Sequence, residues 1–115
     1  MFDLNQEGVD AVAKEIGGIG LKCDVTSSDS ATAAIAKAKE AHGAARILIN
    51  CAGVNRRMPI ADATLDDWDA VMAVNLRGVF LVSQAAQPIM RAQGGGKIVN
   101  IGSLTSTIAL GSVSI

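Results

Sequence analysis

Residues 47–53, with the sequence Ile-Leu-Ile-Asn-Cys-Ala-Gly, constrain the fold of this chain more than any other segment. The apolar residues that begin it are typical of a strand buried in a parallel sheet. The run ends abruptly at Asn50, and the small residues Ala52 and Gly53 follow almost at once. Residues this small allow a flat ligand to lie against the backbone. The segment therefore predicts an α/β protein in which a strand ends at a ligand site.

The rest of the sequence alternates between helical and strand patterns, separated by clusters of Gly, Ser and Thr. The predicted elements are a helix at 6–16, a strand at 21–25, a helix at 31–41, a strand at 46–50, a helix at 65–90 and a strand at 97–101. Residues 2–4 are too short a run to predict a strand of their own. Because crossovers between parallel strands are right-handed, this order predicts one domain over residues 1–115, with three recognisable strands and flanking helices.

Composition and charge exclude several classes of protein. Half of the residues are apolar and 18% are charged, which is typical of a folded globular chain. The net charge of −1 offers no attraction to nucleic acid or to an anionic membrane, and no apolar run approaches the ~20 residues that cross a bilayer. The first residues lack the basic and apolar regions of a signal peptide, so a cytoplasmic location is expected.

The cysteines and the histidine do not predict a metal site. The chain has two cysteines, Cys23 and Cys51, and one histidine, His42, which do not fit the usual zinc spacings. A disulfide between the cysteines is one alternative. A cytosolic α/β chain more often keeps such thiols reduced, and we expect that state here.

Polar or very small residues follow each predicted strand. Asp24, residues 50–53 and residues 100–103 all lie at or just after an apolar run. Ligands of open parallel sheets bind beyond the carboxyl ends of the strands, and Asp24 there can accept a hydrogen bond from an exocyclic amine. Alternatively, Asp24 and Asn50 cap helices or tie loops, which for either residue alone is an equally good interpretation. Three consistent strand ends favour the ligand site.

Asn75 is unusual because it lies within a predicted helix among apolar residues, where Asn is a mediocre helix former. It indicates either a kink or a functional carbonyl. A partly exposed helix residue with no function is the alternative when Asn75 is taken alone.

Four motifs together resemble the short-chain dehydrogenase/reductase family, in order and spacing and over essentially the whole chain. They are Asp24-Val25, Asn-Cys-Ala-Gly at 50–53, Val-Asn-Leu-Arg-Gly at 74–78, and Lys-Ile-Val-Asn-Ile-Gly-Ser at 97–103. Cys51 stands where the family usually has Asn. The resemblance implies a partial Rossmann-like parallel sheet, NAD(P) as cofactor, and hydride transfer to or from a small-molecule alcohol or ketone.

The resemblance also implies cofactor-binding residues. Asp3 matches the acid that hydrogen-bonds the adenine ribose hydroxyls, and a carboxylate there favours NAD and repels the extra phosphate of NADP. Asp24 matches the adenine contact. The other matched cofactor positions are Val25, Asn50, Ala52 and Gly53.

The same resemblance implies catalytic roles for Asn75 and Ser103. Asn75 matches the residue that holds a water in a proton relay. Ser103 matches the Ser whose hydroxyl hydrogen-bonds the substrate oxygen and stabilises developing negative charge. Arg56 and Arg57 follow the turn after Gly53, where tandem Arg is similar to the sugar-acid dehydrogenases of the gluconate 5-dehydrogenase type and suits a carboxylate. A solvated basic loop is the more general interpretation of this pair.

Two parts of the family pattern have no counterpart in the sequence. Residues 17–20 are Gly-rich, but they follow a helix and precede a strand, the reverse of a phosphate-binding turn. The family's acid/base is a Tyr supported by a nearby Lys, but the sequence contains no Tyr, and the implied position lies just beyond Ile115. We therefore expect the 115-residue chain alone to be inactive as an oxidoreductase.

Other functions stay open at this stage. The missing Tyr favours a catalytically dead Rossmann-like remnant that acts as an interaction or assembly module. A flavodoxin-like domain is a third alternative, weakened because no phosphate-binding loop follows a first strand. The family's strand order also places its first two strands between the predicted strands 21–25 and 46–50, so exposed sheet edges are expected. The helix at 68–90 has apolar residues on more than one side, and the family resemblance implies that this helix packs against its mate in a homo-oligomer. Burial of these residues within the same domain is the alternative.

Overall fold

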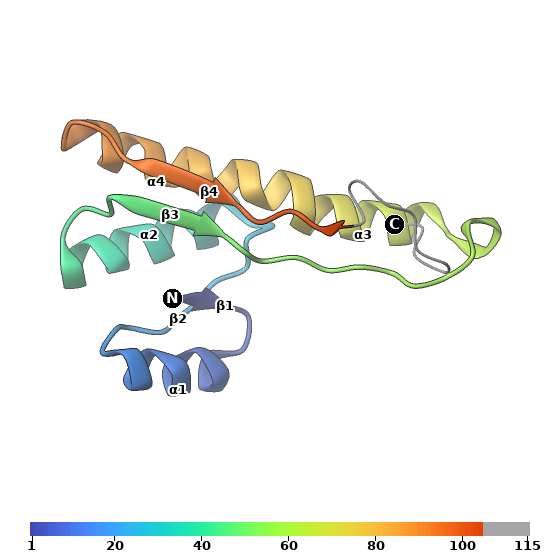
Figure 1. Ribbon diagram of the computed structural model, residues 1–115, viewed down its shortest axis with the longest axis horizontal. Coiled ribbons are helices and arrows are strands. Elements are labelled where there is room, and N and C mark those ends of the chain that lie inside the picture. Colours follow the sequence, from blue (N-terminus) through green and yellow to red (C-terminus); the bar gives the residue numbers. More distant parts are fainter. Residues whose placement is uncertain (105–115) are drawn as a thin grey trace.

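The computed structural model describes residues 1–104. Strands and helices alternate along the chain, as Figure 1 shows by colour from the N-terminus onward. The elements are β1 (Phe2–Asp3), α1 (Gln6–Ile16), β2 (Leu21–Lys22), α2 (Ser28–His42), β3 (Ile47–Asn50), a 3₁₀ turn (Ile60–Asp62), α3 (Leu65–Met72), a π-helical segment (Ala73–Gly78), α4 (Val79–Ala92) and β4 (Lys97–Asn100). The α/β class predicted from the sequence is confirmed.

Local signals fix where the helices begin and end. Asn5 caps α1 by accepting a hydrogen bond from the Gly8 N–H, and α1 ends at Gly17, whose φ of 70° suits a residue without a side chain. The Ser27 side chain caps α2 in the same way. Thr64 and Asp67 form a capping box at the start of α3. These signals are short-range, which is why the helix at 6–16 was predicted to the residue.

The strands form two separate parallel pairs. β1 pairs with β2, and β3 pairs with β4 in a register that sets Ile47 beside Lys97 and Asn50 beside Asn100. The prediction of three strands was wrong in number, because residues 2–3 form a short fourth strand. The predicted strand at 21–25 was too long, since only Leu21–Lys22 pairs. Pairing with a neighbour makes β1 a strand, and no local pattern reveals that neighbour.

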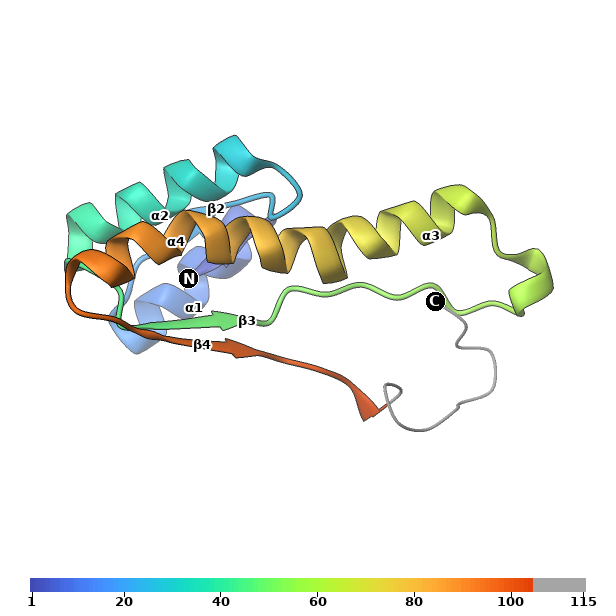
Figure 2. The same cartoon turned by 90° about the horizontal axis from the view of Figure 1, so that it is seen from above.

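Helices α2 and α4 pack on each other, and α4 also lies on β3, as the view from above shows in Figure 2. A small apolar cluster forms at this contact from Ile35, Ala86 and Met90, and Phe2 and Leu48 pack against it from the two sheets. Helix α1 contacts β1 and β2. This arrangement leaves one face of β3 uncovered, with Ile47 and Ile49 63% and 59% exposed.

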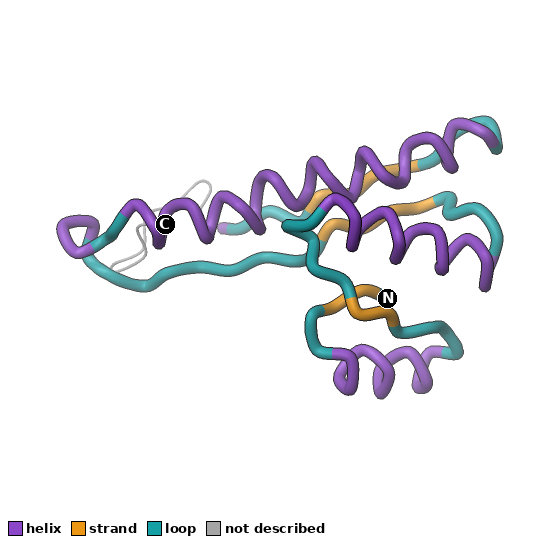
Figure 3. The backbone as a smooth tube through the Cα atoms, turned by 180° about the vertical axis from the view of Figure 1, so that it is seen from behind, coloured by secondary structure: helices purple, strands orange, loops and turns teal. Residues whose placement is uncertain are grey.

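The predicted helix at 65–90 is one continuous helical rod that includes a π-helical stretch. The rod runs from α3 through Ala73–Gly78 into α4 and extends to Ala92, and Figure 3 shows its length against the strands. Pro88 lies inside α4. Asn75 lies in the π-helical stretch, where the regular i to i+4 hydrogen-bond ladder is broken. No helix in the described part of the chain is both long and apolar enough to cross a membrane.

Candidate active site

The carboxyl ends of the strands share one side of the molecule. In Figure 1, β1, β3 and β4 run in the same direction, and β2 is parallel to β1. We call this side the rim, and it carries the residues that follow the strands: Asp3, Asp24, Val25, residues 50–53 and residues 101–103. All the cofactor positions predicted from the sequence belong to the rim. This is the edge of a parallel sheet at which nucleotides bind.

Asn75 is held against the segment that leaves β3. Its side-chain oxygen accepts a hydrogen bond from the Val54 N–H at 2.9 Å, and its side-chain nitrogen donates to the Val54 carbonyl at 2.8 Å. Gly53 lies directly beside this pair, since a methyl group built on it would come within 3.5 Å of the Asn75 Oδ1. The side-chain amide of Asn75 therefore fixes the backbone of the segment that leaves β3.

Asn50 ties the two strands of its sheet to helix α4. It is 9% exposed, and its Nδ2 donates to the Asn100 Oδ1 at 2.9 Å and to the Ser83 Oγ at 3.1 Å. Asn50 and Asn100 are the last residues of β3 and β4, and Asn100 lies three residues before Ser103 in the chain. The network thus sets the positions from which residues 51–53 and 101–103 leave the sheet.

Two carboxylates occupy the other half of the rim. The Asp24 Oδ1 accepts hydrogen bonds from the Thr26 hydroxyl at 2.7 Å and the Thr26 N–H at 2.9 Å. These bonds, the hydroxyl first, lower the pKa of Asp24 below its usual value, so the group is ionised at neutral pH. Asp3 is exposed, and its Oδ1 accepts from the Asn5 N–H at 2.9 Å. Each carboxylate keeps lone pairs free for a further donor.

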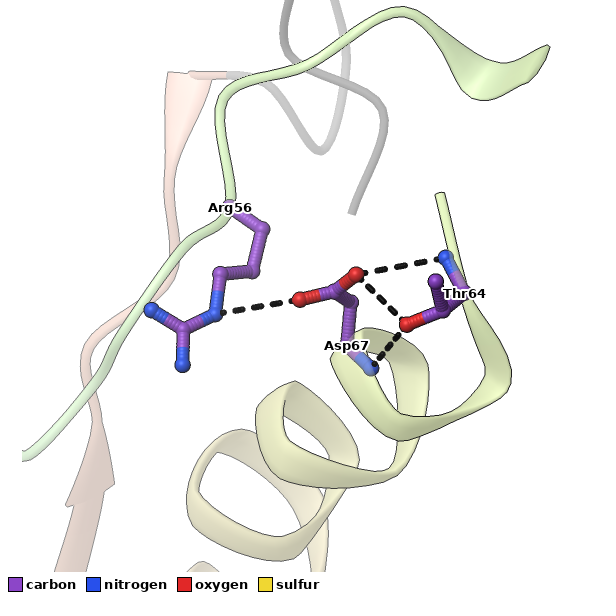
Figure 4. A network of polar contacts seen from close by, with 3 residues as sticks. All are labelled: Arg56, Thr64 and Asp67. Carbon is purple, nitrogen blue, oxygen red and sulfur yellow. Dashed lines mark hydrogen bonds and ion pairs between the residues drawn. The ribbon is translucent and has the colours of Figure 1, made fainter. Parts of the chain in front are cut away.

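Of the two arginines after Gly53, Arg56 has a protein partner. Its Nε lies 3.6 Å from the Asp67 Oδ1, while the other oxygen of Asp67 accepts from the hydroxyl and N–H of Thr64, as Figure 4 shows. The Thr64 bonds, more than Arg56, lower the pKa of Asp67. Arg56 thereby anchors its loop to the start of α3. Arg57 is exposed on the same loop.

The cysteines do not form a disulfide: Cys23 is buried and Cys51 is exposed as a free thiol. Burial raises the pKa of the Cys23 thiol. Within residues 1–104 no cluster of His, Cys, Asp and Glu is suited to a metal ion.

Three partners in these networks were missed by sequence reasoning. Val54 bonds Asn75 through its backbone alone, and a backbone contact cannot be predicted from the residue type. Ser83 fits the helical spacing of α4, and Asn100 lies inside a recognised motif, but nothing in either pattern indicates a bond to Asn50.

The fold is that of an α/β protein with parallel strands and polar or small residues at their carboxyl ends, and comparison with known proteins identifies its family. The family model for short chain dehydrogenase matches residues 1–115. D-threitol dehydrogenase of Mycolicibacterium smegmatis is 42% identical over 113 residues, covering 94% of this chain and 44% of that protein. Gluconate 5-dehydrogenase of Gluconobacter oxydans is 38% identical, covering 91% of this chain and 43% of that protein. The chain belongs to the short-chain dehydrogenase family.

Solved structures agree with this assignment. A gluconate 5-dehydrogenase from Burkholderia cenocepacia, in complex with NADP and tartrate, superimposes with a TM-score of 0.88 at 37% identity, over 99% of this chain and 47% of that one. A metagenomic short-chain oxidoreductase in complex with NADP gives a TM-score of 0.85 at 31% identity, over 97% of this chain and 53% of that one. The chain spans less than half the length of the curated relatives described above.

Proposed function

We propose that this chain forms the nucleotide-binding rim of an NAD(P)-dependent oxidoreductase that transfers hydride between the cofactor and an alcohol or ketone. The observation that carries the proposal is the double hydrogen bond between Asn75 and Val54, 2.8 and 2.9 Å long. It joins a π-helical stretch to the turn after β3, and such stretches are frequent at functional sites. Asn75 would hold a water of the proton relay, and the Ser103 hydroxyl would bond the substrate oxygen.

The residues of the rim fit the adenosine end of a dinucleotide. Ala52 and Gly53 are exposed and small, so a ribose can lie against them. Asp24 is an ionised acceptor for an adenine amine, beside Val25, and Asn50 fixes the strand end beneath them. When bound, the cofactor would supply or accept the hydride.

We propose that Asp3 determines the preference between NAD and NADP. Its exposed carboxylate suits the ribose hydroxyls and repels a phosphate in the same place, so we propose a preference for NAD. The two solved structures described above contain NADP. The proposed preference for NAD therefore rests on Asp3 of this chain and is tested separately.

Isotope-edited NMR titration of the chain with NAD and NADP tests both proposals. We expect binding of about millimolar strength, with shifts at Asp24, Val25 and Gly53, and a weaker response to NADP. Asp3→Ser should remove the preference, and Glu7→Gln, an exposed acid in the first turn of α1, should keep it. Shifts confined to other surfaces would contradict the proposed site.

We also propose that the chain alone does not turn over substrate. The sequence contains no Tyr, the acid/base that the family resemblance implies. The check is the change in nicotinamide absorbance when the purified chain is mixed with NAD and a panel of alcohols and sugar acids. Turnover above background would refute this expectation.

For the substrate we propose a polyol or sugar acid. The relatives include dehydrogenases of threitol and gluconate, and one solved relative holds tartrate. Because Arg56 is engaged with Asp67, Arg57 is the cation we assign to a substrate carboxylate. A chimera in which residues 1–104 replace the matching segment of the Burkholderia enzyme provides the assay. There Arg57→Ala should raise the KM for gluconate, whereas Arg91→Ala, an exposed cation on α4, should leave it unchanged.

A second proposal concerns assembly. Phe80 is 60% exposed and Leu76 is 67% exposed along the outer side of the helical rod, which favours a homo-oligomer. Light scattering should report a mass above that of the monomer, and a purely monomeric chain would overturn this. The same surfaces are what an interaction module would use, so the remnant hypothesis remains the alternative function. A cytoplasmic location stays a prediction.

A further inference from the structure

We propose that Gly78 is a positioning residue for the adenine end of the nucleotide site, because its missing side chain lets Val25 rest directly on the helical rod. This role rests on the proposed function, since the place of Val25 matters to a ligand only if an adenine binds beside it. The role depends on a contact between two residues of this chain and not on which surfaces of the chain are open.

Gly78 and Val25 meet more closely than two side chains could. Gly78 is buried and is the last residue of the π-helical segment. A methyl group built on it would lie 2.9 Å from the Val25 Cγ2 and 3.3 Å from the Val25 Cβ. Carbon atoms pack best about 3.5–4.0 Å apart, and the χ1 angle of a valine is stiff. With any larger residue at position 78, Val25 would therefore have to move.

The backbone of Gly78 does not itself require a glycine. Its φ of −60° and ψ of −45° are ordinary right-handed helical values, which every L-residue adopts without strain. Within a helix, Ala is a better helix former than Gly. Local propensity therefore favours Ala at this position, and the contact with Val25 is the structural reason for Gly.

The segment that carries Val25 is held by α2 as well as by the rod. The Asp24 N–H donates to the Ser30 Oγ at 2.9 Å, and the Asp24 carboxylate accepts the two bonds from Thr26. Val25 lies between these two bonded residues and is half-buried. A displaced Val25 would therefore disturb the apolar contact with an adenine while Asp24 keeps its partners.

The same π-helical segment also carries Asn75, three residues before Gly78. Asn75 bonds the backbone of Val54, in the segment that follows β3. Gly78 contacts Val25, in the segment that follows β2. One short stretch of helix thus contacts both halves of the rim, and it sets the spacing between the adenine contact and the proposed relay residue.

Isotope-edited NMR titration of the chain with AMP tests the role of Gly78. In Gly78→Ala we expect the dissociation constant of AMP to rise about fivefold, which is the value of roughly one buried methyl group. Val25→Ala makes room for the added methyl group, so Gly78→Ala should weaken AMP binding no further in that background. Gly18→Ala is the control, because its methyl group meets nothing closer than 3.7 Å, and it should bind AMP like the unchanged chain.

The outcomes separate this role from the nucleotide site as a whole. Unchanged AMP affinity in Gly78→Ala, or equal losses with and without Val25→Ala, would overturn the role of Gly78 alone. An unchanged chain that shows no AMP response at the rim would overturn the nucleotide site, and the role of Gly78 with it.

Circular dichroism covers the case in which Gly78→Ala does not fold. The double variant with Val25→Ala then decides, because it removes the crowding between the two residues. A folded double variant with the AMP affinity of Val25→Ala would support the role. A double variant that is also unfolded would refute it, since the crowding would then lie with the Ala73 carbonyl, 3.4 Å from the added methyl group.

Discussion

Replacing Asn50 should destabilise the chain more than any other polar substitution at the rim. Asn50→Ala removes the hydrogen bonds to Asn100 at 2.9 Å and to Ser83 at 3.1 Å. A typical bond contributes about 0.5–1.5 kcal/mol net, and a partner left without one costs about 1–3 kcal/mol when buried. Ser83 and Asn100 lie at the protein surface in part, so water recovers some of this loss. We expect a loss of about 2 kcal/mol in the free energy of unfolding.

Urea unfolding followed by far-ultraviolet circular dichroism measures this loss. Ser83→Ala is the matched control, because it removes only one of the two bonds and should cost about 1 kcal/mol. The double variant should then be less destabilised than the sum of the single ones by about 1 kcal/mol, the coupling of the shared bond. Simple additivity, or a cost for Asn50→Ala below about 0.5 kcal/mol, would refute the view that this network joins β3, β4 and α4.

Two further predictions concern packing and pH. Gly20→Ala should cost about 1–3 kcal/mol of stability, because the added methyl group would lie 2.9 Å from the Asp10 backbone N. In the control variant Gly18→Ala the added methyl group meets nothing closer than 3.7 Å, so this change should cost far less. Equal losses of stability in thermal unfolding of the two variants would contradict this prediction. Thr26→Val removes the hydroxyl bond that lowers the Asp24 pKa from 3.8, so the pKa should rise in carboxyl NMR titration. The pKa of Asp24 is lower in the folded chain than in the unfolded chain, so the stabilisation by this bond is present above pH 3.8 and is lost as pH falls through the folded pKa. An unchanged Asp24 pKa in Thr26→Val would contradict the assigned cause.

The sequence was most informative where the signal is local. Helix α1 was predicted from end to end because its apolar spacing and the glycines that follow it act within one or two turns. Strand lengths were less well predicted, since pairing over long sequence separations decides them. The strand predicted at 21–25 ends early because the Asp24 side chain accepts hydrogen bonds from the N–H and hydroxyl of Thr26. These local bonds compete with an extended strand.

At the candidate site, residue types were predictable and their partners were not. Asn75 was singled out because an amide inside an apolar helix is unusual, and it does lie in a π-helical break. Its bonds go to the backbone of Val54, and any residue type could supply such a partner. Tandem Arg predicted a cationic loop, but which arginine is engaged depends on Asp67, held by the capping box of α3.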